Sequence, residues 1–368
     1  MCHHCEQIHD HADKGHRLGH QPEGQPHHDP TAAEPTTQWP SVGRRDFLRS
    51  ALATLAAGGF GRQALAMQRD TGDGIPTRAL GRTGVQIPIV GLGGYHIGLP
   101  EEKEAIRIMH EAVELGMTFF DNSWDYHNGG SEERMGKALA GGGRRDKVFL
   151  MTKVCDRDYK GAKKHLEDSL RRLQTDHIDL WQFHEINWAI DSEWLFDKGG
   201  VRAAIEARRE GKVRHIGFTG HRDIDHHLRL IKKPFDWETV QMPINLLDAH
   251  YRSFQDKVVP VCNQRKIGVI GMKALAGGKI PRELGIPAEL CRRFALTQPI
   301  STLVCGIQTR KELLQDVEMA RGFQPVREEE IRRLLAKTEE PGGDGQMEPW
   351  KTTDYGSRYH REQHEGVG

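Results

Sequence analysis

The sequence predicts an α/β fold in which eight parallel strands, each followed by a helix, close into a (β/α)8 barrel. Three observations support this prediction. Short apolar runs alternate with segments whose apolar residues recur at helical spacing, a hairpin pattern precedes the first run, and three successive runs end in side chains suited to proton transfer. Alternation of strands and helices favours a parallel sheet, and eight such units favour its closure into a barrel.

The chain enters the barrel through a predicted β-hairpin. Residues 78–80 and 85–87 have the pattern of short strands, and residues 81–84 between them begin and end with glycine. Residues 89–95 are the expected first barrel strand, whose glycines let the backbone approach a ligand. Residues 101–115 follow as a helix with one apolar face.

The strand and helix pattern then repeats up to residue 320. The other seven strands are expected at residues 118–121, 148–153, 178–183, 213–218, 239–243, 267–272 and 301–306. The helices after them are expected at residues 131–140, 160–174, 200–210, 223–231, 256–265, 288–296 and 309–320. These elements define a predicted barrel domain over residues 75–337.

The chain as a whole carries no net charge. Its 52 lysines and arginines balance 52 aspartates and glutamates among 368 residues. We therefore expect no nucleic acid or other polyanion as a partner. No apolar run is long enough for a stable membrane span.

Both ends of the chain differ from the middle. Residues 1–40 are rich in histidine, glutamine and proline and poor in aliphatic residues, which predicts a disordered leader. Cys2, Cys5 and the nearby histidines could hold a metal ion as a loose cluster, but their spacing is not that of a closed zinc module. Residues 338–368 form a predicted C-terminal tail without periodicity.

Residues 41–66 have the layout of an export signal. The pair Arg44 and Arg45 precedes a mildly apolar segment too short to span a membrane comfortably, and an Ala-x-Ala cleavage site ends at Ala66. This pattern resembles a bacterial twin-arginine (Tat) signal peptide. We expect the Tat translocase as a partner during export and a periplasmic or exported location. The alternative is an amphipathic helix with a chance arginine pair.

Four side chains near the ends of three successive predicted strands have the properties of a proton-transfer site. Asp121 ends one apolar run and Tyr126 follows it on a short loop, whereas Lys153 and His184 end the next two runs. A tyrosine acts as a general acid near neutral pH only when its pKa falls from about 10, and a nearby ammonium such as Lys153 can lower it. Each residue alone is better explained as a cap, a surface charge or a core histidine, but the four in order indicate one site.

These residues resemble the tetrad of the aldo/keto reductase superfamily. The family motif of Asp, Tyr, Lys and His matches Asp121, Tyr126, Lys153 and His184, and the resemblance extends in consistent order over residues 77–321. It implies a TIM barrel and an NAD(P)H-dependent oxidoreductase that reduces an aldehyde or ketone to an alcohol, or the reverse. The resemblance makes Tyr126 the general acid, whose pKa Lys153 lowers, and His184 the group that orients the carbonyl oxygen. The reaction needs no metal.

The resemblance also places a nicotinamide nucleotide in the second half of the barrel. Thr219, Gly220 and His221 stand where the family often has a Ser-Asn pair for the carboxamide, and Gln241 matches a family glutamine with the same role. Glycine-bearing loops with exposed N–H groups suit the pyrophosphate. The predicted cofactor-binding residues are Gly94, Tyr95, Thr219, Gly220, His221, Gln241, Met272, Lys273, Leu275, Gly277, Gly306, Thr309, Arg310, Gln315 and Asp316.

The adenosine end departs from the family pattern. The Lys-Ser and Arg that clamp the 2′-phosphate in many members are absent, and Gln315-Asp316 replaces the usual Glu-Asn. Thr309 and Arg310 at a helix N-terminus remain to bind phosphate. NADP is the expected cofactor because most of the family uses it, and NAD is also possible.

The expected substrate is a small carbonyl compound or alcohol. Tyr95 and Trp124 leave strand ends beside the tetrad, and Trp188 lies on the long loop over residues 185–196, so these three are the predicted substrate-binding residues. For the aromatic residues of this loop two interpretations remain, a substrate wall and a hydrophobic cluster that holds the loop. The C-terminal tail covers the substrate, as C-terminal loops often do in related proteins, or its last ten residues are a mobile solvated end.

Two other functions remain open. The same fold serves nucleotide-binding partner subunits that sense redox state with little turnover. The Tat route carries folded proteins, so it would let such a chain keep its nucleotide, but an exported protein exchanges spent cofactor poorly. A metal-handling role would rest on the leader, which cleavage after Ala66 would remove. The scattered cysteines beyond the leader indicate no disulfide framework.

Overall fold

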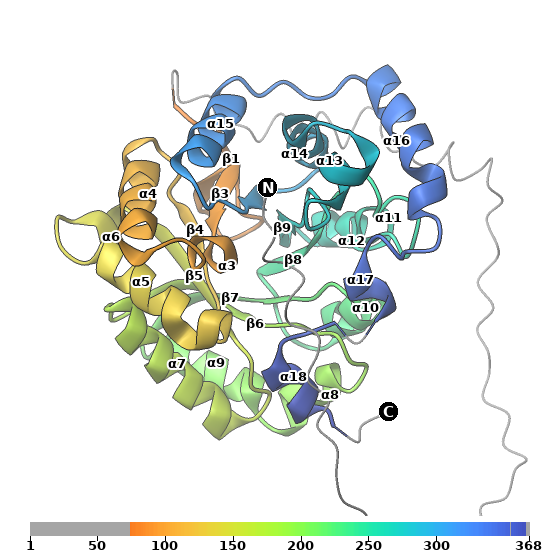
Figure 1. Cartoon of the computed structure of the whole chain (residues 1–368). Coiled ribbons are helices and arrows are strands. Elements are labelled where there is room, and N and C mark those ends of the chain that lie inside the picture. The colour runs from red at the N-terminus through yellow and green to blue at the C-terminus, as the bar shows by residue number, and fades with distance from the viewer. Residues whose placement is uncertain (1–73, 354, 366–368) are drawn as a thin grey trace, which may run out of the picture. The chain divides into compact units, whose positions relative to one another are not determined.

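The computed structural model describes residues 74–353 and 355–365. The predicted leader, the Tat signal and its cleavage site after Ala66 therefore lie outside the described residues. The described chain consists of a hairpin, a barrel with its surrounding helices, and a helical C-terminal segment (Figure 1).

Eight parallel strands form a closed barrel, which confirms the predicted fold. Consecutive strands are neighbours all the way round, and β10 pairs with both β9 and β3. The register places Gly93 beside Asp121 and Thr219 beside Gln241. The strands are β3 (Val90–Gly93), β4 (Phe119–Asp121), β5 (Phe149–Val154), β6 (Ile178–Phe183), β7 (Val213–Thr219), β8 (Thr239–Pro243), β9 (Gly268–Met272) and β10 (Thr302–Cys305).

The predicted N-terminal hairpin is present and packs against one end of the barrel. Strands β1 (Thr77–Ala79) and β2 (Gln86–Pro88) pair in antiparallel fashion. Leu80 and Ile87 from this hairpin are buried. They share an apolar cluster with side chains from β4, β5, β6 and β9, namely Phe119, Met151, Leu180 and Ile270. The barrel interior at this end is therefore a packed core and not a pore.

A helix follows each barrel strand, and the helices surround the barrel (Figure 1). Their apolar faces meet the strands in one large buried cluster. The predicted helix over residues 256–265 is instead two helices, because Pro260 suits a first turn but not a helix interior. The helices are α4 (Glu102–Glu114), α5 (Gly130–Leu139), α7 (Tyr159–Leu173), α9 (Gly200–Arg209), α10 (Ile224–Lys232), α11 (Phe254–Lys257), α12 (Val259–Gln264), α14 (Ala288–Thr297) and α15 (Arg310–Arg321).

Short helices occupy several of the connections. The first barrel strand ends at Gly93 and not at residue 95, because Gly94 begins a short helix. A Cβ atom on Gly94 would lie 2.4 Å from the Asp121 carbonyl oxygen, so only glycine allows this close approach of the two backbones. The short elements are α3 (Gly94–Ile97), η1 (Tyr126–Gly129), α6 (Arg144–Lys147), α8 (Asp191–Asp197) and α13 (Lys279–Leu284).

The C-terminal segment is helical, which the sequence pattern did not reveal. Helix α16 (Glu328–Gly342) continues past residue 337, and α17 (Pro349–Thr352) and α18 (Arg358–Gln363) follow it. Trp350 belongs to an apolar cluster with residues of α13, α14 and α16. His360 in α18 is fully buried, so the interpretation of this tail as a solvated end is wrong for α18.

No helix among the described residues combines the length and the apolar character needed to cross a membrane. The cysteines in the same part of the chain are all buried and free. For this part of the chain the prediction that no disulfide framework exists is confirmed. These cysteines are Cys155, Cys262, Cys291 and Cys305.

Candidate active site

The four predicted catalytic side chains come together at the C-terminal ends of β4, β5 and β6. Asp121 ends β4, Lys153 lies one residue before the end of β5, and His184 directly follows β6. Tyr126 begins η1, the turn that follows β4. Because the strands are parallel, these ends share one edge of the barrel, the edge at which enzymes of this fold carry their active sites.

Lys153 connects Asp121 to Tyr126. Its Nζ donates to Asp121 Oδ1 at 2.5 Å and to the Asn122 carbonyl at 2.6 Å. The same Nζ lies 3.4 Å from the Tyr126 hydroxyl and 4.8 Å from the centre of its ring. The side chains of Asp121 and Lys153 are both buried. The ion pair therefore holds the ammonium against the phenol in one orientation.

The surroundings of Tyr126 raise the pKa of its hydroxyl, in contrast to the lowering expected from the sequence. Burial is the main cause, and the carboxylates of Asp121, Asp125 and Glu185 add to it. Lys153 does not reverse the shift, because Asp121 lies close enough to offset most of its charge. Tyr126 is therefore protonated at neutral pH and available as a proton donor.

The turn that carries Tyr126 has an unusual backbone. His127 and Asn128 adopt φ angles of 53° and 54°, in the left-handed region that few side chains occupy. A hydrogen bond of 2.7 Å between His127 Nε2 and the Tyr95 carbonyl holds this turn. The Tyr95 ring meets the Tyr126 ring edge-on at 5.5 Å. Strain of this kind gathers at functional sites, and here it belongs to the turn that brings the phenol to Lys153.

His184 belongs to a second polar cluster beside the lysine. Its Nδ1 lies 3.0 Å from Ser123 Oγ and 3.1 Å from Asp125 Oδ1. Although burial acts to raise it, the pKa of Asp125 is held well below its usual range, mainly by His184. The ring centres of His184 and Tyr126 are 5.5 Å apart. Because Nδ1 is engaged in this cluster, Nε2 is the nitrogen left for a carbonyl oxygen.

The predicted carboxamide site contains a buried acceptor without a partner. Thr219 ends β7, and Gln241 lies within β8. The two residues are paired in the parallel register of these strands, and both are buried. In the described part of the chain, Oε1 of Gln241 has no hydrogen-bond partner. Buried side-chain oxygens are seldom left in this state, so a ligand N–H group fits here. A primary carboxamide offers that group.

Gly220 and His221 continue this strand end. A Cβ atom on Gly220 would lie 2.6 Å from His227 Cε1, so the position requires glycine. Burial lowers the pKa of His221 to about 4, which leaves its ring neutral, and its Nδ1 has no partner. The His221 N–H donates to Asn187 Oδ1 at 3.2 Å, while Asn187 Nδ2 is also without a partner. The sequence analysis did not single out Asn187, because no motif accompanies it.

The loop after β9 was predicted to hold the pyrophosphate. Gly277 has a φ angle of 64°, and no atom lies within 4 Å of where its Cβ would be, so there is open space beside it. The Lys273 ammonium lies 4.7 Å from the Trp350 ring and 5.1 Å from the Tyr355 ring, so the C-terminal segment packs over this lysine. Of the other predicted residues here, Met272 ends β9 and Leu275 packs in the apolar cluster with Trp350.

The residues predicted for the adenosine end have partners within the protein. Thr309 caps α15 by accepting the Glu312 N–H at 3.2 Å, and Arg310 pairs with Glu111 at 2.6 Å. A nucleotide phosphate would have to replace these contacts. Of the remaining predicted residues, Asp316 lies 3.0 Å from Arg292. Gly306 packs against His96, and Gln315 is exposed on α15.

The predicted substrate-binding residues Tyr95 and Trp124 have different surroundings. The Tyr95 side chain is 46% exposed beside the Tyr126 ring. Trp124 stacks on His165 with ring centres 3.6 Å apart, and its Nε1 donates to Asp168 at 3.3 Å. Trp124 is therefore held firmly by α7, whereas Tyr95 reaches the surface. Their contact with a substrate remains a prediction.

The loop after His184 is tied to the C-terminal segment. Trp188 and Trp194 both stack on His364, with ring centres 4.0 and 4.9 Å away. His364 Nε2 also lies 2.8 Å from Asp191 Oδ1. This packing favours the hydrophobic-cluster interpretation of the loop over a substrate wall. A role of Trp188 in substrate binding remains a prediction.

Helix α18 brings a further histidine to the site, and the same helix lies beside α8 (Figure 1). The His360 ring centre is 5.4 Å from that of His184, and the Ser357 N–H donates to Glu185 Oε2 at 3.1 Å. The sequence analysis missed Glu185 and His360 because no local pattern connects them. Asp125 stood in the motif-bearing stretch but was given no role.

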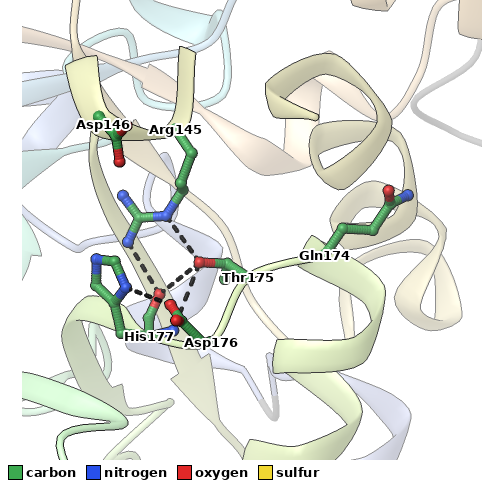
Figure 2. Close-up of a pocket in the computed structure, with 6 residues that line it drawn as sticks. All are labelled: Arg145, Asp146, Gln174, Thr175, Asp176 and His177. Carbon is green, nitrogen blue, oxygen red and sulfur yellow. Dashed lines mark hydrogen bonds and ion pairs between the residues drawn. The ribbon is translucent and has the colours of Figure 1, made fainter. Parts of the chain in front are cut away.

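An open pocket at the other end of the barrel has no comparable chemistry (Figure 2). Its residues precede β5 and β6 and therefore lie at the N-terminal ends of the strands. Arg145 spans it by donating to Thr175 Oγ1 at 3.0 Å and to the His177 carbonyl at 2.9 Å. Residues at this end of such barrels serve stability. The lining residues are Arg145, Asp146, Gln174, Thr175, Asp176 and His177.

Comparisons with known proteins agree with this fold. Residues 89–285 match the Aldo/keto reductase family. The chain is 36% identical over 224 residues to the uncharacterized oxidoreductase YrpG of Bacillus subtilis, an alignment that covers 54% of this chain and 66% of the relative. It is 32% identical over 228 residues to L-galactose dehydrogenase of Arabidopsis thaliana, covering 57% of this chain and 68% of that enzyme.

A solved structure shows the same architecture. The aldo-keto reductase AKR11C1 from Bacillus halodurans, in its holo form, has a TM-score of 0.61 and 26% identity, and the match covers 71% of this chain and 95% of that one. Alignments with several curated relatives, YrpG included, span slightly less than two thirds of their length. The family match extends over more than half of the 368 residues. The chain therefore belongs to the aldo/keto reductase family.

Proposed function

We propose that this protein moves hydride between a nicotinamide nucleotide and an aldehyde or ketone, with Tyr126 as the proton donor. The observation that carries the proposal is the line of contacts from Asp121 through Lys153 to the Tyr126 hydroxyl, with His184 beside it. These groups supply a proton, a charge to stabilise the phenolate and a second polar group for the same oxygen.

The ends of β7 and β8 suit the carboxamide of a nicotinamide. Gln241 Oε1 and Asn187 Nδ2 are both buried without partners, so they offer an acceptor and a donor to an amide. When bound, the reduced nucleotide supplies the hydride. NADP is proposed over NAD only because many members of the family use NADP. Arg310 gives no further support for a phosphate contact, because it is already paired with Glu111.

In the reducing direction the side chains act on the carbonyl oxygen. Tyr126 donates its proton as negative charge develops on that oxygen. Lys153, 3.4 Å from the phenol oxygen, stabilises the phenolate that forms, and Asp121 holds the lysine in place. His184 hydrogen-bonds to the same oxygen through Nε2. Because the pKa of Tyr126 is raised, the phenol enters the reaction protonated, and stabilisation of the phenolate by Lys153 is needed for the proton to leave.

The substrate is proposed only as a class, a small aldehyde or ketone and the matching alcohol. The activity named for L-galactose dehydrogenase belongs to that plant enzyme, and loop changes readily alter the substrate of a barrel of this kind. The aromatic ring of Tyr95 beside Tyr126 favours a substrate with apolar surface next to its carbonyl group.

The test is turnover of NADPH and NADH across a panel of aldehydes and ketones. Tyr126→Phe should lower kcat by roughly 10²- to 10⁴-fold, the usual contribution of a general acid. Nucleotide affinity, measured by fluorescence titration, should stay nearly unchanged. Tyr159→Phe is the matched control, because it removes a tyrosine hydroxyl that donates to Glu206 and has no proposed role in the site. Full activity of Tyr126→Phe, or loss of nucleotide binding with it, would show that the role is misassigned.

A nucleotide-binding sensor with little turnover is a second candidate. It is favoured by the close packing of the C-terminal segment, in which His360 reaches the His184 ring. The two candidates differ in measurable ways. A sensor would retain stoichiometric nucleotide through purification, release it slowly and reduce no member of the carbonyl panel, whereas an enzyme would exchange nucleotide at least as fast as it turns over.

We also propose export by the twin-arginine route, on the basis of Arg44, Arg45 and the Ala-x-Ala site ending at Ala66. A protein carried in the folded state can keep a nucleotide bound in the cytoplasm. Intact mass of the protein from the periplasmic fraction should correspond to a chain that begins near Met67. An intact leader in a cytoplasmic fraction would contradict the proposal, and Arg44→Lys with Arg45→Lys should retain the protein inside the cell.

A further inference from the structure

His184 shares a buried cluster with three other potential metal ligands. One ligand atom each from Asp125, Cys155, His184 and His360 lies within 4.8 Å of the other three. Cys155 and His360 are fully buried, and the His184 and Asp125 side chains are nearly so. The cluster therefore gathers a carboxylate, a thiol and two imidazoles around one point. Of these, the reductase chemistry uses only His184.

The distances within the cluster are close to those of a tetrahedral metal site. His184 Nδ1 lies 3.1 Å from Asp125 Oδ1 and 3.7 Å from Cys155 Sγ. Zinc bonds of the usual lengths to oxygen, nitrogen and sulfur separate neighbouring ligand atoms by about 3.2–3.7 Å. Asp125 and Cys155 are thus both at the required distance from His184. The fourth, His360, offers a ring nitrogen within 4.8 Å of the other three ligand atoms.

His360 provides an independent sign of a ligand. The residue is fully buried, and neither ring nitrogen has a hydrogen-bond partner among residues 74–353 and 355–365. Buried imidazole nitrogens in folded proteins are nearly always satisfied. The Oε2 atom of Glu185 lies 3.8 Å from His360 Nε2, beyond hydrogen-bond distance but suited to orient a ligating ring. A metal ion would satisfy one nitrogen of this ring.

The formal charges around the cluster also favour a cation. Within the described part of the chain, Asp125 pairs with His184 and Glu185 with His221, and neither carboxylate pairs with a lysine or arginine. The nearby Lys153 and Arg157 are each already paired with an aspartate. Buried charges are stable only when they are paired or bind a metal. The backbone at Glu185 adopts a φ angle of 51°, a strained conformation of the kind that collects at ligand sites.

The geometry points to a binding site for a divalent cation of the zinc type, held by Asp125, Cys155, His184 and His360. One oxygen, one sulfur and two nitrogen ligands suit zinc better than magnesium or calcium, which prefer oxygen alone. On binding, the Cys155 thiol releases its proton to solvent and the thiolate takes its place on the metal. The inference does not depend on reductase activity.

Metal binding would define the state of His184. With Nδ1 on the metal, the neutral ring carries its remaining proton on Nε2, which is then a fixed hydrogen-bond donor toward the site of Tyr126. In the metal-free arrangement, Ser123 Oγ donates to Asp125 Oδ1 at 2.6 Å and contacts the same His184 Nδ1. Ser123 would give up the contact with Nδ1 when the metal binds.

The test is a cobalt(II) titration of the full chain carrying Cys2→Ser and Cys5→Ser, so that no leader thiolate contributes. Histidines of the leader also bind cobalt, but they give no thiolate-to-cobalt charge-transfer band in the near ultraviolet. We expect this band to saturate at about one equivalent and to disappear when zinc is added, because zinc displaces cobalt from such sites. Elemental analysis of the purified protein identifies the native ion.

Variants assign the band to this cluster. Cys155→Ser should abolish it and His360→Asn should weaken cobalt affinity by about tenfold or more. Cys262→Ser, another buried cysteine, and His250→Gln, which hydrogen-bonds to Thr338 of α16, are matched controls and should change neither property. Circular dichroism verifies that each variant is folded. Absence of the band, or its survival in Cys155→Ser, would overturn the inference, and full affinity in His360→Asn would remove His360 from the site.

Discussion

Replacement of Lys351 by methionine should detach the C-terminal segment from the barrel. The Lys351 side chain is fully buried, and its Nζ lies 2.6 Å from Asp248 Oδ1, 2.7 Å from Glu348 Oε2 and 2.8 Å from the Tyr251 carbonyl. Methionine fills a similar volume but leaves two buried carboxylates facing each other. The same segment carries the helix that brings His360 to the site.

The cost can be worked from these contacts. Removing one partner of a buried ion pair costs about 3–5 kcal/mol. Burial and Asp248 raise the pKa of Glu348 to about 7, although Lys351 opposes the shift, so Glu348 can take up a proton and relieve part of the cost. In the variant, Asp248 still accepts hydrogen bonds from the backbone N–H groups of Phe254 and Gln255. We therefore expect a loss of about 3 kcal/mol at pH 8 and a smaller loss at pH 6.

Glu348→Gln is the matched control at the same contact. A carboxyl whose pKa is higher in the folded state than its usual value of about 4.5 favours the folded state less and less as the pH rises toward 7. The neutral amide removes this penalty and can keep the hydrogen bond of 2.9 Å from Asn245 Nδ2. We expect Glu348→Gln to be as stable as the wild type, or more stable, at pH 8.

The assay combines urea denaturation followed by circular dichroism with limited trypsin digestion followed by intact mass. Lys351→Met should lose C-terminal fragments first, at a urea concentration at which the wild type and Glu348→Gln remain intact. The reasoning would be refuted if Lys351→Met lost less than about 1 kcal/mol at pH 8, the size of an exposed ion pair, or if Glu348→Gln were the less stable of the two.

Two further predictions concern the barrel itself. Gly136→Ala places a Cβ 2.1 Å from the Arg172 carbonyl oxygen where α5 crosses α7, so it should lower the free energy of unfolding in urea by about 1–3 kcal/mol. Gly130→Ala in the same helix, where the nearest atom to the new Cβ is 3.9 Å away, should lower it by less than half as much. Equal losses in the two variants would contradict the packing argument. Burial lowers the pKa of His227 to about 3, and because this is below the unfolded value, its contribution to stability is complete above about pH 6.5 and is lost as the pH falls. His227→Gln should reduce the slope of unfolding free energy between pH 6.5 and 4 by up to about 1.4 kcal/mol per pH unit, and an unchanged slope would show that this histidine is not buried in its neutral form.

The barrel could be predicted from the sequence because its signals are local. Each strand is a short apolar run and each helix shows its own apolar spacing, so that β4, β5 and β6 could be placed without knowledge of their partners. Asp121, Lys153 and His184 then had to meet, because parallel strands bring their C-terminal ends to one edge. Pro260 carried the signal for the division between α11 and α12, but the apolar pattern across it was read as one helix.

The position of α18 beside the site could not be predicted, because it depends on contacts between distant parts of the chain. Helix α18 is short and is held by His364, which stacks on Trp188 and contacts Asp191. Neither partner is visible from the sequence around α18. The position of His360 beside His184 follows only once this packing is known.

The direction of the pKa shift at Tyr126 was also beyond the sequence. A lysine near a tyrosine suggests a lowered pKa, but the net effect depends on burial and on the other charges nearby. Here Asp121 lies against the lysine, and Asp125 and Glu185 add negative charge around a buried phenol. The consequence is a tyrosine that donates a proton readily only when charge develops on a bound substrate.

The most direct test of the account is transfer of deuterium from a reduced nicotinamide nucleotide labelled at both C4 positions. The protein is incubated with this nucleotide and the carbonyl panel, and the products are analysed by mass spectrometry. The account predicts alcohol with one deuterium on the former carbonyl carbon for the wild-type protein and almost none for Tyr126→Phe. Deuterated alcohol formed equally by Tyr126→Phe, or no labelled product from a wild-type protein that binds the nucleotide, would contradict the assignment of this site as a carbonyl reductase.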